Sequence, residues 1–186
     1  GLTAVMKSSS AASQELKNLR EVAKLPGLGF KEAVQGSINL QAAGFSAELA
    51  RRSLSAFGNA LATVGKGKSE LDGVNLALSQ IASKGKISAE EINQIAERVP
   101  QIRKVTEAAF GTSNTEVLQK RGISSTEFVT KIVAELEKLP KVTGGIQNTF
   151  ENLSDTIQQA LVPVGNAILR VLIPAIEAIT PYIEKA

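Results

Sequence analysis

The stretch that decides the fold is SAELARRSLSAFGNALATV, residues 46–64. Its apolar side chains recur three or four positions apart, at Ala50, Leu54, Phe57, Leu61 and Val64. This spacing places them on one face of an α-helix, and Ser46 is a suitable N-cap residue. The stretch therefore predicts an amphipathic helix that buries this face against neighbouring helices.

The same helical period extends in both directions from this stretch. Helices are predicted over residues 10–25, 31–43 and 126–139. The helical period also restarts over residues 71–81, and a further helix over 88–100 is followed by one that continues to 110. Pro26-Gly27, Gly65–Lys68, Pro100 and Pro140 separate them. No stretch alternates apolar and polar residues with β-branched enrichment, so the predicted fold class is all-α. We expect a multi-helix bundle of short capped helices, whose short loops favour antiparallel neighbours.

A local pattern precedes three of the predicted helices: a glycine, an apolar residue and then a serine. It occurs at residues 44–46, 85–88 and 122–124. Ser88 with Glu91, and Ser124 with Glu127, have the spacing of capping boxes, in which each residue of the pair bonds the other's backbone N–H. Ile87 and Ile123 are placed to pack as hydrophobic staples on the first turns of the following helices.

After Gly144-Gly145 the period changes to eleven residues and continues to the end of the sequence. An apolar packing stripe is predicted at Ile146, Phe150, Leu153, Ile157, Leu161, Val164, Ile168, Leu172, Ile179 and Ile183. Pro163, Pro174 and Pro181 fall on the opposite, polar side, where prolines bend a helix around what its apolar side contacts. Residues 141–186 are thus predicted to form a proline-punctuated amphipathic arm after a helical domain at 1–140. The alternative is a set of short helices broken at Pro163 and Pro174.

An apolar stripe of this kind has to be covered by something. Packing against the bundle or a partner helix is the favoured interpretation, and adsorption to a membrane surface is the alternative. A transmembrane helix is disfavoured because Asn166, Arg170 and Glu177 would enter hydrocarbon. The stripe still continues at the last residues without a C-cap, so we expect the chain to be a piece of a longer polypeptide.

Composition excludes several chemistries. The 186 residues include no His and no Cys, which excludes a histidine-based triad, a thiol nucleophile, a disulfide framework and a standard zinc site. The net charge of +3 is mild, and the basic residues are scattered rather than clustered with aromatic ones. Arg51-Arg52 and Lys120-Arg121 are therefore interpreted as solvated pairs rather than as contacts to nucleic acid.

Two further patterns resemble catalytic or binding motifs. Residues 62–69, ATVGKGKS, fit a relaxed phosphate-binding loop, but that loop follows a buried strand, whereas these residues follow a helical stripe. A helix connection solvated by its two lysines is predicted instead. The acid pairs at 90–91 and at 135 and 137 lie at a helix start and in a charged surface run. No catalytic, cofactor-binding or metal-binding residue is predicted, and no cofactor.

A family resemblance supplies a function. The segments LQAAGFS at 40–46, AFGNAL at 56–61 and ALSQIASKGKISAEEINQIAE at 77–97 resemble the tape measure domain of tailed-bacteriophage and prophage tail proteins. The run from 79 to 94 is the most specific part. Residues 25–30, 109–111 and the proline-punctuated arm over 152–183 are also similar to this family.

The resemblance implies a structural virion protein. Tape measure proteins set tail length during assembly, occupy the lumen of the tail tube after assembly in the host cytoplasm, and leave it ahead of the DNA. The implied partners are other copies of the chain in a homo-oligomer, the tail tube, the tail tip and the tail assembly chaperones. Specific nucleic acid is not among them, and membrane contact is expected only during ejection. The alternative function is a helical membrane-active or scaffold module that acts through the arm.

Overall fold

The computed structural model describes residues 1–25 and 28–142, and the chain there is helical. The helices are α1 (Leu2–Met6), α2 (Ser9–Val22), α3 (Phe30–Ala42), α4 (Ala47–Ala62), α5 (Lys68–Lys84), α6 (Ala89–Arg98), α7 (Ile102–Phe110), α8 (Thr115–Lys120) and α9 (Ser125–Leu136). These described residues contain no β-strand, only one isolated antiparallel bridge between Lys86 and Ser124. The all-α prediction is therefore confirmed.

Helix α4 forms where residues 46–64 predict it. Ser46 is its N-cap, and the Ser46 hydroxyl oxygen accepts a hydrogen bond from the backbone N–H of Leu49 at 3.1 Å. Leu54 and Phe57 are buried, as the apolar period predicts. Val64 was expected on the same buried face, but it is 42% exposed. The helix ends at Ala62, so Val64 belongs to the following turn and no longer follows the helical period.

The other predicted helices appear as α2, α3, α5, α6, α7 and α9, with bounds that differ from the prediction by a few residues. Helices α1 and α8 were not predicted. Helix α8 does carry a start signal, because the side-chain oxygen of Asn114 accepts hydrogen bonds from the N–H groups of Glu116 and Val117, at 2.9 and 3.3 Å. Each of the two helices is short and contributes one buried residue, Leu2 or Leu118, which is too little for a periodic signal.

The turns before α4, α6 and α9 share a backbone feature. Gly44, Gly85 and Gly122 have φ angles of 117°, 66° and 69°, in the region that glycine adopts more readily than other residues. The glycine of the recurring sequence pattern therefore makes the turn that leads to the serine N-cap.

Neither predicted capping box is reciprocal. The Ser124 hydroxyl accepts from the N–H of Glu127 at 3.1 Å, but the Glu127 carboxylate forms an ion pair with Lys131 at 3.1 Å. At the start of α6, the Ser88 hydroxyl makes no cap bond to the backbone and donates to the Glu91 carboxylate instead. The prediction of two capping boxes was wrong because a nearby lysine or hydroxyl offers each glutamate a better partner than a backbone N–H.

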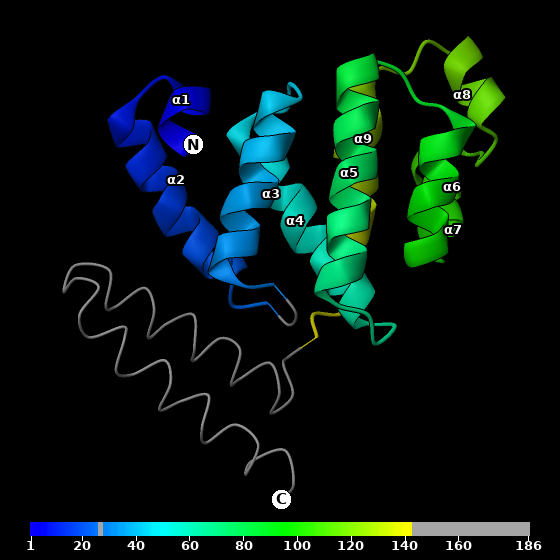
Figure 1. The fold of residues 1–186 in the computed structure, drawn as a ribbon. Coiled ribbons are helices and arrows are strands. Elements are labelled where there is room, and N and C mark those ends of the chain that lie inside the picture. The colour runs from blue at the N-terminus through cyan, green and yellow to red at the C-terminus, as the bar shows by residue number, and fades with distance from the viewer. Residues whose placement is uncertain (26–27, 143–186) are drawn as a thin grey trace, which may run out of the picture.

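The helices pack in an order that follows the chain and is closed by the last helix (Figure 1). Helix α3 packs on α2, α4 and α5, and α6 packs on α5. Helix α9 returns to pack against α4, α5 and α7, so it connects the middle of the bundle to its far end. The largest fully buried side chains come from both halves: Phe57, Phe128, Leu19, Leu40, Leu54, Leu61, Leu78, Ile81, Ile87, Ile95, Ile102 and Leu118.

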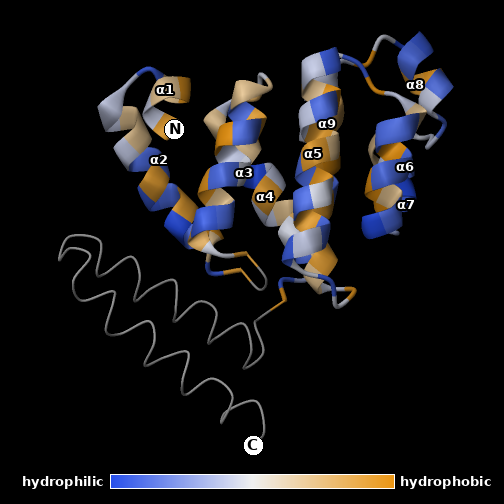
Figure 2. Cartoon of the chain, in the orientation of Figure 1, coloured by the Kyte–Doolittle hydropathy of each residue, from blue (hydrophilic) through white to orange (hydrophobic). Residues whose placement is uncertain are grey.

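Polar and apolar residues alternate around each helix, as amphipathic helices require (Figure 2). Within residues 1–25 and 28–142, no helix is long and apolar enough to cross a bilayer. The arm, with the whole apolar stripe from Ile146 to Ile183, lies outside the described residues.

Candidate functional site

The loop that resembles a phosphate-binding motif connects two helices. Helix α4 ends at Ala62, and α5 begins at Lys68 with Gly67 as its N-cap. Lys66 donates hydrogen bonds from its Nζ to the carbonyls of Glu97 and Arg98, at 3.0 and 2.9 Å. These carbonyls lie at the carboxyl end of α6, where a positive charge is favourable. The helix connection is confirmed, but Lys66 is an anchor for α6 rather than a solvated side chain.

The second lysine of this loop is also engaged. Lys68 forms an ion pair with Glu32, which joins the start of α5 to the start of α3. Burial alone would raise the pKa of Glu32, but the hydrogen bond from Lys68 contributes to a net lowering. Both lysines of the motif therefore hold helices together instead of presenting their charges to a phosphate.

The acid pair at the start of α6 has one buried and one exposed member. Glu91 is fully buried, whereas the side chain of Glu90 is 72% exposed. The Glu91 carboxylate accepts hydrogen bonds from the Lys84 ammonium and the Ser88 hydroxyl. Burial is the largest single influence and would raise the pKa of Glu91, but these two hydrogen bonds, a backbone hydrogen bond and the charge of Lys84 together lower the pKa. A proton-transferring acid at neutral pH needs the opposite shift, so this carboxylate is suited to a structural ion pair.

The acid pair near the end of α9 also forms ion pairs. Glu135 contacts Lys138 at 2.6 Å. Glu137 accepts two hydrogen bonds from the Arg52 guanidinium, at 2.9 Å from Nε and 2.7 Å from the terminal nitrogen. This two-point contact joins α4 to the end of α9, and the hydrogen bonds lower the pKa of Glu137 and raise that of Arg52.

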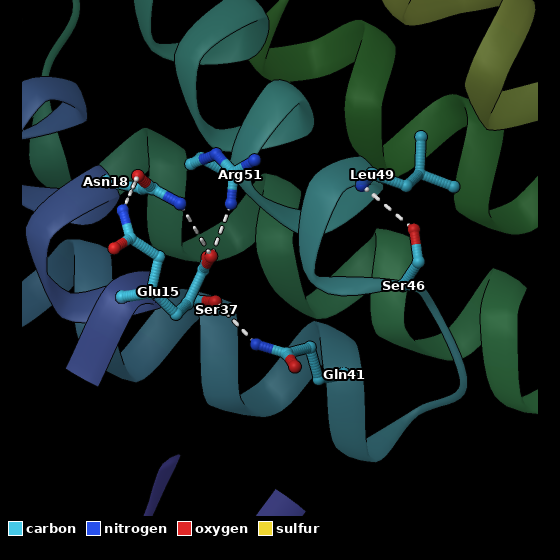
Figure 3. A network of polar contacts seen from close by, with 8 residues as sticks. Glu15, Asn18, Ser37, Gln41, Ser46, Leu49 and Arg51 are labelled. Carbon is cyan, nitrogen blue, oxygen red and sulfur yellow. Dashed lines mark hydrogen bonds and ion pairs between the residues drawn. The ribbon is translucent and has the colours of Figure 1, made fainter. Parts of the chain in front are cut away.

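The neighbouring Arg51 joins α4 to α2. Its guanidinium donates to the carboxylate of Glu15, which is only 3% exposed, and Asn18 donates to the same oxygen at 3.5 Å (Figure 3). A buried carboxylate needs such partners. Arg121, from the other basic pair, donates to the carbonyl of Phe110 at 2.9 Å. Besides being at least partly exposed, these arginines make contacts that hold the helices together, which the interpretation as solvated pairs did not include.

The surface has two notable hollows. One of about 700 Å³ lies between α3 and α5, and its lining includes Gly36, Asn75 and the exposed Leu76. The other, of about 440 Å³, lies between α2, α4 and the end of α9. Over the described part of the chain, no group of three or more Asp, Glu, His or Cys side chains is placed to hold a metal ion.

One residue with a clear positioning role was missed by the sequence reasoning. Asn59 lies on α4 with 6% exposure. Its side-chain nitrogen donates to the carbonyl of Pro140 at 3.1 Å, and its side-chain oxygen accepts from the N–H of Val142 at 2.9 Å. The signal available in the sequence was an asparagine between Phe57 and Leu61, within the stretch that buries its apolar face.

Comparison with known proteins identifies the family. A sequence model described as "Tape measure protein" matches residues 1–173. No curated protein and no solved structure matches the chain. The matched range covers all the residues described by the structure and continues into the arm, and the family is a structural component of phage tails. The chain belongs to the tape measure protein family.

Proposed function

We propose that this chain is a folded helical domain of a longer ruler that sets the length of a phage tail during assembly and is ejected ahead of the DNA. The observation that carries this proposal is the family match over residues 1–173. The ion pairs that join α2, α3 and α9 to their neighbours support a structural role, because they use charged residues to fix helix positions.

The proposed location is the lumen of the tail tube, reached after assembly in the host cytoplasm. The proposed partners are other copies of the chain, the tube, the tip and the tail assembly chaperones. Specific nucleic acid has no place among them, and membrane contact occurs only during ejection. Each of these follows from the family role and not from a contact in the structure.

The location is tested on virions. Intact particles and particles triggered to eject are treated with protease, and the chain is followed with an antibody against residues 1–142. We expect protection before ejection, with loss of the chain from the tail afterwards. Digestion in intact particles, or absence of the chain from purified tails, would contradict the proposal.

The proposed domain organisation is a helical domain at 1–140 followed by an amphipathic arm at 141–186. The residues proposed to form the arm's packing surface are those of the apolar stripe from Ile146 to Ile183. The alternative function, a membrane-active or scaffold module, depends on the same stripe. Flotation of the chain with anionic and neutral vesicles distinguishes the two: we expect no lipid association, and flotation of the chain would favour the alternative.

A further inference from the structure

Helices α1 and α2 lie at one edge of the bundle (Figure 1). Helix α1 packs on α2 and α3, and α2 packs on α3 and α4. The later helices make their main contacts among themselves, because α3, α4 and α5 pack together and α9 joins α4 and α5 to α7. If α1 and α2 left the bundle, the contacts among the later helices would therefore remain.

The face that α2 buries is short of apolar side chains. Its buried residues follow one another at intervals of three or four: Ala12, Glu15, Leu19 and Val22. This is the spacing of one helical face, and a charged residue occupies the second of its four positions. Helix α9 is two residues shorter but buries five apolar side chains, including Phe128 and Leu136. Because apolar burial is the main favourable term in helix packing, α2 is held less strongly than α9.

The charged position on this face is only half satisfied. Glu15 is 3% exposed, and its Oε2 accepts hydrogen bonds from Arg51 of α4 and from Asn18. Its Oε1 is also buried and has no hydrogen-bond partner among the described residues. A buried charge with incomplete partners costs free energy, which is recovered when the charge returns to water. The Glu15–Arg51 ion pair thus fixes the position of α2 but holds it less tightly than an apolar pair of the same size would.

We propose that α1 and α2 form a strap that opens and closes as one unit while α3–α9 stay folded, with the Glu15–Arg51 ion pair as its latch. The latch selects one closed position, because a displaced strap would bury the Glu15 carboxylate without its arginine. Opening exposes the faces of α3 and α4 that α2 covers. The chain therefore has a partly open state besides the closed one in Figure 3. The inference is independent of the role in the tail.

Native-state hydrogen exchange on the full 186-residue chain tests the strap. Amides that a local opening exposes exchange faster than amides that only full unfolding exposes. We expect the slowest-exchanging amides of α2 to share one protection factor, at least about ten-fold lower than that of the slowest amides in α4 and α9. Equal protection in α2, α4 and α9 would overturn the proposal, because α2 would then open only with the whole bundle.

Two double variants test the latch. Glu15→Met/Arg51→Met replaces the buried pair by apolar side chains, and the control Glu21→Met/Lys24→Met removes an ion pair of α2 whose side chains are both 70% exposed. We expect the first to raise the protection factors of α2, relative to those of α4, at least about five-fold, and the control to leave them within about two-fold.

Glu15→Gln alone leaves Arg51 without its carboxylate and should lower the protection of α2. Unchanged or lowered protection in Glu15→Met/Arg51→Met would overturn the role of the latch, as would an equal rise in the control. Circular dichroism shows whether each variant is folded, and exchange in the unsubstituted chain tests the strap without any variant. The experiment concerns the isolated chain, so its failure would leave the proposed function intact.

Discussion

At the scale of single residues, the buried carboxylate of Glu91 shows how charge is used in this bundle. It lies at the first turn of α6, and its partner Lys84 belongs to the last turn of α5. The pair therefore fixes the angle between two consecutive helices across the Gly85 turn. Removing one partner of a buried pair leaves the other polar group unsatisfied, which costs more than the bond itself contributes.

This pair makes stability depend on acid pH. The folded-state pKa of Glu91 lies below its ordinary value of 4.5, so its contribution is fully present above that pH and is lost as the pH falls through the lower, folded-state pKa. Glu32 and Glu137 shift in the same direction. We expect the free energy of unfolding to fall below about pH 4.5, with a shallower fall in Glu91→Gln. Urea unfolding between pH 3 and 7 measures this.

At neutral pH the Glu91→Gln substitution should lower the free energy of unfolding by about 1–3 kcal/mol. Glu90→Gln, at the exposed neighbouring position, is the matched control and should change it by less than about 0.5 kcal/mol. Equal losses from the two substitutions would show that general charge, and not the buried contact with Lys84, explains the effect.

At the scale of helices, α3 approaches α4 closely at Gly36. A Cβ atom added there would lie 2.7 Å from Cδ2 of Leu54 and 3.0 Å from Nδ2 of Asn75. Leu54 is fully buried and has little room to move. Gly58, in α4, has its nearest such neighbour at 3.8 Å. Two helical glycines thus differ in whether a methyl group fits beside them.

Gly36→Ala and Gly58→Ala should therefore change stability in opposite directions. Alanine in a helix is favoured over glycine by about 0.5–1 kcal/mol, and overpacking a filled core costs about 1–3 kcal/mol. We expect Gly36→Ala to destabilise the chain by roughly 1–2 kcal/mol and Gly58→Ala to stabilise it by up to about 1 kcal/mol. Thermal unfolding compares them, and stabilisation by both would mean that α3 and α4 have room to separate.

Sequence periodicity identified the longer helices and failed at their edges. The stripe of Leu54, Phe57 and Leu61 is buried as predicted, because a long amphipathic helix repeats its signal over several turns. Val64 was predicted wrongly because α4 ends at Ala62, before the apolar period does. Helices α1 and α8 were missed because such short helices contain too few apolar residues to show a period. The lysine partners of Glu91 and Glu127 also depend on side-chain positions that sequence spacing does not specify.

At the scale of the whole molecule, the bundle is closed by α9, which packs against α4, α5 and α7. These contacts join residues far apart in the chain, so no local pattern could predict them. A helix was predicted over residues 126–139, but the helices that pack around its buried Phe128 and Ile132 were not. The clamp from Asn59 to residues 140 and 142 is a long-range contact of the same kind.

The helical domain should fold without the arm. A fragment of residues 1–142 retains all the described core contacts, so we expect it to be helical and to unfold cooperatively on heating. A fragment of residues 1–124 lacks α9 and is the control; it should lose cooperative unfolding because α4, α5 and α7 lose a shared neighbour. If both fragments unfolded cooperatively, α9 would be dispensable. If neither did, the arm would be required.

The central claim is that this chain belongs to a ruler whose length sets the length of the tail. The most direct test is tail length in electron micrographs after in-frame deletions and matching insertions in the complete gene, outside the region that encodes residues 1–186. For a helical ruler with a rise of about 1.5 Å per residue, 100 residues correspond to roughly 150 Å. We predict tails shortened by the deletions and lengthened by the insertions in proportion to residue number. Tails of unchanged length in both series would contradict the account.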